Sequence, residues 1–279
     1  MKRSRSDPAP VAAVGVGSNW AALSKKIRAI GPAATVPSAR GPGGVAPSAT
    51  LDPAKNDALL AARATVLGPF GTEELKGEHT RVLALDCEMV GVGSDGRRSA
   101  LAQVVIVDWS GRILLNRYVR PAETVTDFRT HVSGVTSAHL KHAEPLAAVQ
   151  RDVSALLRGC TLVGHGLEND MKALLLSHPS AATRDTAKFQ TFCWRAGALG
   201  KWRPSKLKTL AEKHLQLNIQ VQGASHEPAE DARAALALYK LYRRDWEHLL
   251  IKIKDKTASG GGAGGKKKMG GGAFNIITK

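Results

Sequence analysis

The sequence predicts a mixed α/β fold, in which helices flank a central β-sheet, as a single domain between two disordered tails. Three apolar, β-rich segments follow one another from about residue 81 and would form a meander. Helical and strand-like patterns then alternate to residue 254, which is typical of a sheet covered by helices. The foldable part is 76–254, which is long enough for one buried core.

The two ends of the chain have compositions that favour disorder. Residues 1–75 are rich in Ala, Gly, Pro and Ser, so we expect a basic tail with one short helix at 19–30. Its basic residues fit a nucleic-acid-binding arm, a nuclear import signal or an organellar transit peptide over residues 1–50, and the basic start favours the nucleus. Residues 255–279 are rich in Gly and Lys and predict a second flexible tail.

Strand and helix positions follow from apolar spacing and from the residues at element ends. The segment 144–158, for example, places Val149, Val153 and Leu157 on one helical face. Proline and glycine mark several boundaries. We expect strands at 81–90, 101–109, 112–119, 161–165 and 182–186, and helices at 144–158, 170–176 with Asn169 as its cap, 205–215 and 229–254.

Overall composition narrows the function further. The 279 residues include 40 Lys and Arg against 24 Asp and Glu, a formal net charge of +16, which favours a polyanionic partner such as nucleic acid, although solubility alone also fits. Three scattered cysteines form no C-x-x-C pair, which favours a reducing compartment. No apolar run approaches the roughly 18 residues that a membrane span requires, so we expect no membrane partner.

Two carboxylates, Asp86 and Glu88, close the first apolar run. Because successive strand side chains point to opposite faces, both acids would share one face, and Cys87 would face the core without a chemical role. Neighbouring acids repel each other and are costly to desolvate, and a divalent cation relieves both effects. A strand end frayed into solvent would need no cation, so the pair alone leaves both interpretations open.

Three further residues would complete a metal site. Asp170 follows the strand expected at 161–165, and Asp231 lies in the first turn of the last helix, five residues after His226. If the strands are neighbours, their carboxyl ends bring the acids to one edge of the sheet. Four carboxylates would hold about two Mg²⁺ or Mn²⁺ ions, and His226 would take a proton from an attacking water. Each residue alone also fits a helix N-terminus or a surface loop.

The order of these motifs resembles that of the DEDD exonuclease superfamily, in the subgroup whose fifth residue is histidine. Residues 84–91 (ALDCEMVG) resemble the first motif, 163–170 (VGHGLEND) the second and 226–234 (HEPAEDARA) the third. The similarity extends over about 80–250 and points to an RNA exonuclease branch that processes ribosomal RNA. Residues 125–135 resemble the substrate loop of that branch.

This resemblance implies an RNase H-like fold and 3′→5′ hydrolysis of single-stranded RNA ends to nucleoside 5′-monophosphates. It also implies pre-ribosomal particles as partners and a nuclear, nucleolar location. The family usually has small polar residues where Glu227 and Pro228 stand, and we expect the charge of Glu227 to raise the pKa of His226. The implied roles are ligands of two Mg²⁺ or Mn²⁺ ions for Asp86, Glu88, Asp170 and Asp231, general base for His226, and substrate contacts for Met89 and Arg129.

Basic and aromatic residues alternate over 186–211 without an acidic residue. Basic groups can follow phosphates while rings stack on unpaired bases, although buried rings beside a solvated charged face would give the same pattern. We expect Phe192 to be the ring with the weakest case for substrate contact. The candidate substrate contacts are Lys188, Arg195, Lys201, Trp202, Arg203 and Lys206, with Phe189 and Trp194 as further rings.

Three functions therefore stay open from the sequence. The first is a metal-dependent RNA exonuclease, the second an exonuclease that acts mainly on DNA, and the third a non-catalytic RNA-binding factor in ribosome assembly. No residue reads a 2′-hydroxyl directly, so the preference for RNA rests on the resemblance. A scaffold has no need of four mutually repelling acids, which argues against the third.

Overall fold

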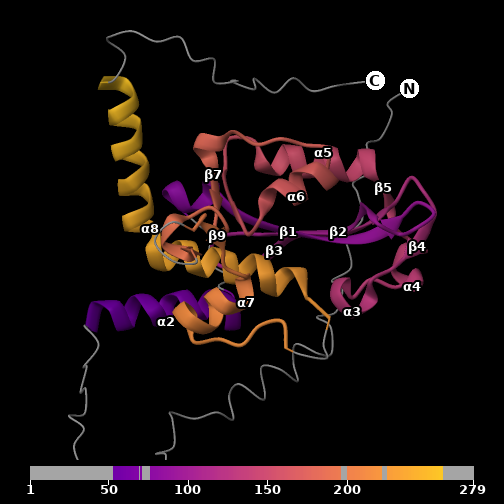
Figure 1. The fold of residues 1–279 in the computed structure, drawn as a ribbon, viewed down its shortest axis with the longest axis horizontal. Coiled ribbons are helices and arrows are strands. Elements are labelled where there is room, and N and C mark those ends of the chain that lie inside the picture. The colour runs from indigo at the N-terminus through magenta and orange to yellow at the C-terminus, as the bar shows by residue number, and fades with distance from the viewer. Residues whose placement is uncertain (1–52, 69, 71–75, 196–199, 222–224, 260–279) are drawn as a thin grey trace, which may run out of the picture. The chain divides into compact units, whose positions relative to one another are not determined.

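The computed structural model describes residues 53–259 except 69, 71–75, 196–199 and 222–224. The described residues form a mixed β-sheet with helices on both faces (Figure 1), so the predicted fold class is confirmed. The short helix expected at 19–30 lies outside the described residues, as do most of the N-terminal tail and the end of the C-terminal one.

The main sheet has seven strands in the order β5-β3-β2-β1-β6-β7, with β4 paired to the end of β1. Strands β1, β2 and β3 form the expected antiparallel meander, and β6 runs parallel to β1 as its neighbour, as expected. The strands are β1 (Val82–Val92), β2 (Arg98–Val107), β3 (Ile113–Arg120), β4 (Val125–Asp127), β5 (Glu144–Pro145), β6 (Thr161–Gly164) and β7 (Thr183–Asp185), with a separate hairpin of β8 (Cys193–Trp194) and β9 (Arg203–Pro204).

Helices form a layer on each face of the sheet. Helices α5 and α6 cover one face, and α8 with α2 and α7 covers the other (Figure 1). The α-helices are α2 (Pro53–Leu67), α3 (Thr130–Ser133), α4 (Ser137–Leu140), α5 (Leu146–Leu157), α6 (Leu167–Ala173), α7 (Leu207–Leu210) and α8 (Pro228–Ser259). Single turns of 3₁₀ or π-helix are η1 (Gly77–Arg81), η2 (Ser180–Ala182), η3 (Gln190–Phe192) and η4 (Ala211–Leu215).

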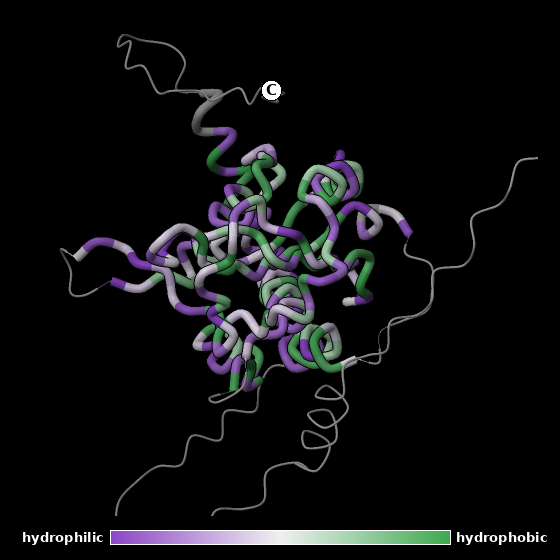
Figure 2. Tube along the Cα trace, turned by 90° about the vertical axis from the view of Figure 1, so that its right-hand side faces the viewer, coloured by the Kyte–Doolittle hydropathy of each residue, from purple (hydrophilic) through white to green (hydrophobic). Residues whose placement is uncertain are grey.

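The core is divided by the sheet into two apolar clusters. Val82 and Ala84 of β1 pack toward α8, whereas Leu83 and Leu85 pack toward α5 and α6. This alternation is the two-residue period of a strand buried on both faces. Figure 2 shows hydrophobic and hydrophilic stretches alternating along the helices around the sheet, as expected for helices that bury one side. Within the described part of the chain, no helix combines the length and apolarity that crossing a membrane requires.

Helix α2 corrects the expected limit of the N-terminal tail. The sequence predicts disorder through residue 75, but Pro53–Leu67 is a helix that buries Ala62 and Val66 against α8. Lys240 of α8 also donates a hydrogen bond to Thr65 Oγ1 at 2.8 Å. The alanines that indicated low complexity are the residues with the strongest helix propensity, and Pro53 opens the helix where proline is favoured.

Other boundaries differ by a few residues from those expected. Helix α6 begins at Leu167 with Gly166 as its cap, so Asn169 lies inside the first turn and caps nothing. The helix expected at 205–215 is one α-turn followed by one π-turn, and α8 continues to Ser259. The C-terminal tail therefore begins later than residue 255.

Candidate active site

Strand β1 presents Asp86 and Glu88 on the sheet face that α8 covers. The two acids continue the alternation of Val82 and Ala84, which pack toward α8. The β1–β2 ladder pairs Glu88 with Gln103 and then shifts register, a β-bulge directly after the second acid. Bulges of this kind re-aim side chains beside functional sites. The prediction that both acids share a face is confirmed, since Cys87 between them packs with Leu83 and Leu85 in the opposite cluster.

Asp170 reaches this edge through a tight turn between β6 and α6. A Cβ added to Gly164 would lie 2.4 Å from Leu167 Cδ2 and 2.9 Å from the backbone oxygen of Leu85, so glycine allows the close approach of strand and helix. Gly166 then takes a φ of +73° and donates its N–H to Asp185 Oδ1 at 2.8 Å. The turn places Asp170, which is buried, in the first turn of α6.

Cys87 faces the opposite side of β1 from the acids, as expected, and is 6% exposed in the core cluster with α5 and α6. Its thiol nevertheless hydrogen-bonds the carboxylate of Asp170. Burial, followed by the charges of Asp170 and Asp86, raises the pKa of the thiol well above its usual value, so the thiol stays protonated and donates. Cys87 thus supports one carboxylate of the site, which corrects the expectation that it has no chemical role.

The last two residues come from the N-terminal end of α8 and the segment before it. The N–H of His226 donates to Val132 O at 2.8 Å, which ties this segment to α3. Pro228 is the first residue of α8, and Asp231 follows within the first turn. His226 Nδ1 lies 3.5 Å from Asp231 Oδ2.

The four acids and the histidine therefore converge. Ligand atoms of Glu88, His226 and Asp231 lie within 4.8 Å of one another. Asp86 lines the same cavity of about 320 Å³, and Asp170 is close enough to repel Asp86 and Glu88. The predicted constellation is thus present as a geometric cluster at one edge of the sheet.

Burial and mutual repulsion raise the pKa values of these acids. Burial, then the charges of Asp231 and Asp170, raises the pKa of Glu88 to about 9. Burial raises the pKa of Asp170 to about 7 and that of Asp231 to about 7. Asp86 also has a pKa well above its usual value, because of burial and the charges of Asp231, Asp170 and Glu88. The described surroundings of the four acids therefore favour the protonated forms.

The donor set fits divalent cations. Asp231 Oδ1 is buried and accepts no hydrogen bond from any described residue. Buried oxygens in native proteins normally have a partner, so an unpartnered carboxylate oxygen inside an acidic cluster points to a ligand. Hard carboxylate oxygens are the ligands that Mg²⁺ and Mn²⁺ prefer.

The expected effect of Glu227 on His226 is wrong. The pKa of His226 is lowered by burial and then by the positive charge of Lys208. Glu227 is exposed and is not among the causes of the shift. A lowered pKa keeps the imidazole neutral at pH 7, the form that accepts a proton.

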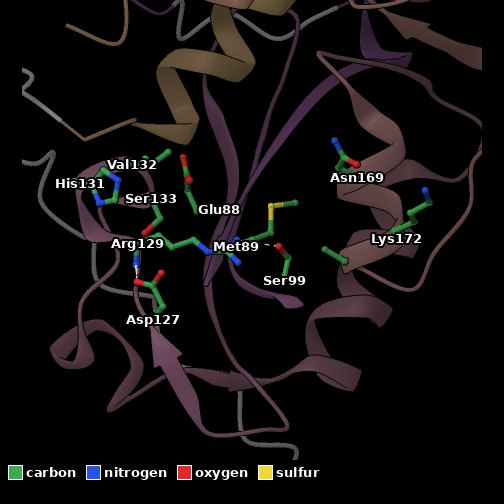
Figure 3. Close-up of a pocket in the computed structure, with 11 residues that line it drawn as sticks. Glu88, Met89, Ser99, Asp127, Arg129, His131, Val132, Ser133, Asn169 and Lys172 are labelled. Carbon is green, nitrogen blue, oxygen red and sulfur yellow. Dashed lines mark hydrogen bonds between the residues drawn. The ribbon is translucent and has the colours of Figure 1, made fainter. Parts of the chain in front are cut away.

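A larger cavity of about 800 Å³ adjoins the acids. Figure 3 shows Glu88 and Met89 between two walls, one from α3 with His131 and the other from α6 with Asn169 and Lys172. Met89 thus lines this cavity, and its contact with substrate stays a prediction. Its neighbour Glu88 joins this cavity to the acidic cluster.

Arg129 also lines the larger cavity, but its guanidinium is largely engaged within the protein. It donates to Ser99 Oγ at 2.9 Å and to Gly96 O at 2.8 Å, and its backbone is left-handed with a φ of +49°. Arg129 therefore braces the segment 125–135 against the β1–β2 turn, and its role as a substrate contact stays a prediction that would use the remaining donors.

The aromatic residues between 186 and 211 divide into two groups. Phe189 and Phe192 are 5% and 2% exposed and pack with Trp246, so stacking on substrate is wrong for both. Trp194 and Trp202, on the β8–β9 hairpin and directly before its second strand, are 49% and 52% exposed.

The basic candidates lie on the surface or at the cavity. Arg195 lies over the Trp202 ring at 5.2 Å from its centroid, and Lys201 and Arg203 are exposed on the same hairpin. Lys188 is exposed and forms an ion pair with Glu168 at 3.6 Å. Lys206 lines the acidic cavity itself.

Two residues support the site without belonging to its motifs, and the sequence marks Lys208 only as one of the six basic residues at 186–211. Gln220 lines the acidic cavity and donates from Nε2 to Asp231 Oδ2 at 2.7 Å. Lys208 Nζ donates to Gln220 O at 3.1 Å, and its positive charge lowers the pKa of His226. Neither belongs to a charge pair or motif visible in the sequence. The basic run that includes Lys208 was the one signal available.

The similarity to known proteins covers the segment that contains these site residues. A family model described as an exonuclease, RNase_T, matches residues 83–239. The RNA exonuclease 4 of Xenopus laevis is 48% identical over 175 residues, which are 63% of this chain and 40% of that protein. The RNA exonuclease 4 of Debaryomyces hansenii is 42% identical over 192 residues, 69% of this chain and 68% of that protein.

A solved structure supports the fold. The Saccharomyces cerevisiae Pan2 pseudoubiquitin hydrolase–RNA exonuclease module in complex with AAGGA RNA has a TM-score of 0.51 and 25% identity. The match covers 70% of this chain and 36% of that one. This chain spans less than half the length of the RNA exonuclease 4 proteins from Xenopus laevis, Mycosarcoma maydis and Homo sapiens that it matches.

Proposed function

This chain belongs to the exonuclease family whose model matches residues 83–239, in the RNA exonuclease 4 branch, and we propose that it hydrolyses RNA from the 3′ end to nucleoside 5′-monophosphates. The observation that carries the proposal is the convergence of Asp86, Glu88, Asp170, Asp231 and His226 at one sheet edge. Buried acids that repel one another make the folded state less stable unless a bound cation offsets their charge. Such a cluster is therefore typical of a functional site.

Divalent cations account for the arrangement of the acids. Asp86, Glu88, Asp170 and Asp231 would hold two Mg²⁺ or Mn²⁺ ions, and Asp231 Oδ1 is a buried oxygen that still needs a partner. Bound there, such ions would offset the acidic charge and stabilise the attacking and leaving oxygens of a phosphodiester. Cys87 and Gln220 would keep two of the carboxylates in place by donating to them.

His226 is suited to act as the general base. Its Nδ1 faces Asp231 Oδ2, which leaves Nε2 on the other edge of the ring to accept a proton from water. The hydrogen bond from its N–H to Val132 O holds the residue at the boundary between the two cavities.

The substrate would run from the larger cavity to the hairpin. A terminal nucleotide fits the cavity walled by α3 and α6, with Met89 against it. The exposed Trp202 and Arg195 would receive bases and phosphates upstream, because rings stack on unpaired bases and guanidinium groups pair with phosphates. The Pan2 module named above binds RNA, which supports a single-stranded RNA substrate for this chain.

We extend the proposal to processing of ribosomal RNA precursors in the nucleus and nucleolus. The support is the sequence resemblance together with the basic residues at the start of the chain and the Lys-rich stretch near its end. Localisation of the tagged chain with and without residues 1–50 tests this, because that cut leaves α2 intact. Unchanged localisation would contradict a nuclear signal in the removed segment.

An end-labelled assay tests the enzymatic proposal. The full chain is incubated with Mg²⁺ and 5′-labelled single-stranded RNA or DNA of one sequence. We expect a ladder shortening from the 3′ end, faster for RNA, and release of nucleoside 5′-monophosphates. Asp86→Asn should abolish the ladder, whereas Asp152→Asn, at an exposed position on α5, should not. Equal activity in wild type and Asp86→Asn would contradict catalysis by this site, and faster loss of DNA would reverse the substrate order.

A further inference from the structure

We propose that Gln220 is a positioning residue that fixes the carboxylate of Asp231 so that its Oδ1 is presented to a divalent cation. The inference rests on the proposed metal-dependent function and adds a residue that no motif contains. It concerns the orientation of one ligand and leaves the identity of the ligand set unchanged.

The two carboxylate oxygens of Asp231 have different hydrogen-bond partners. Gln220 Nε2 donates to Oδ2 at 2.7 Å, and the same oxygen lies 3.5 Å from His226 Nδ1. The other oxygen, Oδ1, is buried and accepts no hydrogen bond from any described residue. Engaging one carboxylate oxygen with a neutral donor leaves the second free and fixes the plane of the group.

The backbone around Gln220 is built to present this amide. The residue has a φ of +51°, a left-handed conformation that is unfavourable for a long side chain. Three contacts hold it: its N–H donates to Glu230 Oε2 at 3.3 Å, its carbonyl accepts from Lys208 Nζ at 3.1 Å, and the preceding Ile219 is 1% exposed in the core. A strained residue held on three sides beside an acidic cavity is the pattern of a functional constraint.

Among the described residues, Gln220 donates the hydrogen bond that holds Oδ2, and Gln220→Leu or Gln220→Gly removes it. The carboxylate would then sample rotations in which neither oxygen is aligned for a cation. We expect weaker cation binding, with little change in the fold, because the contacts of residue 220 with Glu230 and Lys208 use its backbone and do not need the amide. Outer partners of metal ligands typically contribute about 10- to 100-fold to metal affinity.

Two variants and a matched control separate the amide from the backbone. Gln220→Leu removes the donor at similar volume, and Gln220→Gly removes it while relieving the positive φ. Gln216→Leu is the control, since Gln216 is an exposed glutamine with a φ of +54° in the same connection before α8. Mn²⁺ is titrated into each full-length protein by electron paramagnetic resonance, beside thermal melts without metal and RNA hydrolysis at low and high Mn²⁺.

We expect the Mn²⁺ dissociation constant to rise about tenfold in both Gln220 variants and to stay at the wild-type value in Gln216→Leu. Gln220→Gly should melt no lower than wild type without metal, and high Mn²⁺ should restore hydrolysis in both variants. If Gln220→Leu proves unstable, the glycine variant decides. Wild-type Mn²⁺ affinity in Gln220→Gly would overturn the role of Gln220 alone. A wild type that neither binds Mn²⁺ nor hydrolyses RNA would overturn the proposed function itself.

Discussion

Individual carboxylates in this protein are held in states that free amino acids do not favour. Glu88 has a pKa of about 9, raised by burial and by the charges of Asp231 and Asp170. Cys87 and Gln220 each donate a hydrogen bond to one of the neighbouring acids, which offsets part of this cost. At this scale the site combines destabilising charge with local support, as expected of groups retained for function.

Replacing Glu88 by Gln tests the cost of this charge. A carboxyl whose folded pKa is raised contributes stability below its unfolded pKa near 4.5 and loses it as pH rises through about 9. We therefore expect the melting temperature of the metal-free protein to fall as pH rises through this range. At pH 8 with EDTA, Glu88→Gln should melt higher than wild type, by about 2–4 °C per kcal/mol of repulsion removed. An equal or lower melting temperature of Glu88→Gln would contradict the destabilising effect of this charge. Whatever its melting temperature, Glu88→Gln should not hydrolyse RNA when Mg²⁺ is present.

The lowered pKa of His226 predicts a pH dependence that two neighbours should affect differently. Lys208 lowers this pKa through its positive charge, so Lys208→Gln should raise it. Because the base must be neutral, the acid limb of the rate profile should move to higher pH. Glu227→Gln serves as the control and should leave the limb in place. A shift caused by Glu227→Gln, with none from Lys208→Gln, would restore the original expectation for Glu227.

At the level of secondary structure, the site is formed by a bulge in one strand and by the N-terminal ends of two helices. The bulge after Glu88, the glycine turn before α6 and the proline start of α8 each bring a carboxylate to the same edge. Helix α2 supports the element that carries Asp231, since it packs along α8. Regular elements thus fix the positions, and their termini aim the side chains.

Helix α2 should behave as part of the folded domain. Val66 is 1% exposed against α8, whereas Leu60 on the same helix is 55% exposed. We expect Val66→Asp to lower the free energy of unfolding by at least about 2 kcal/mol, because an unpaired charge enters the core. Leu60→Asp should change it little. Chemical denaturation measures both, and equal small effects would contradict the packing of α2 on α8.

The β8–β9 hairpin should contribute substrate affinity without chemistry. Trp202 is 52% exposed, with Arg195 over its ring, and neither lines the acidic cavity. We expect Trp202→Ala to weaken binding of single-stranded RNA by about 1–3 kcal/mol, roughly 5- to 150-fold, at an unchanged turnover number. Trp202→Phe should restore most of the affinity. A lowered turnover number with unchanged affinity would place Trp202 in another role.

Across the whole molecule, the sequence predicts what depends on local periodicity and misses what depends on distant packing. Alternation along β1 places Asp86 and Glu88 on one face, and this holds because the period of a strand is local. Helix α2 was missed because its contacts reach α8, 175 residues away for Thr65 and Lys240. Because of these contacts, the alanine-rich segment packs as part of the core.

Contacts between residues distant in sequence also decide which residues support the site. Phe189 and Trp202 lie in one basic, aromatic segment. The packing of Phe189 against the rings of Tyr242 and Trp246, which are distant in sequence, makes it core. Gln220 has a role because its backbone φ is positive and its amide reaches Asp231, neither of which leaves a mark in composition or spacing. The motif residues were predictable, whereas the residues that hold them in place were not.

Anomalous scattering from crystals of the protein grown with Mn²⁺ would locate any cations bound by the four carboxylates. We expect two manganese peaks within about 4 Å of each other among Asp86, Glu88, Asp170 and Asp231, one of them in contact with Asp231 Oδ1. Crystals of Asp231→Asn should lose at least one peak. Wild-type crystals with no manganese at these carboxylates would contradict the claim that this cluster is a metal-dependent hydrolytic site.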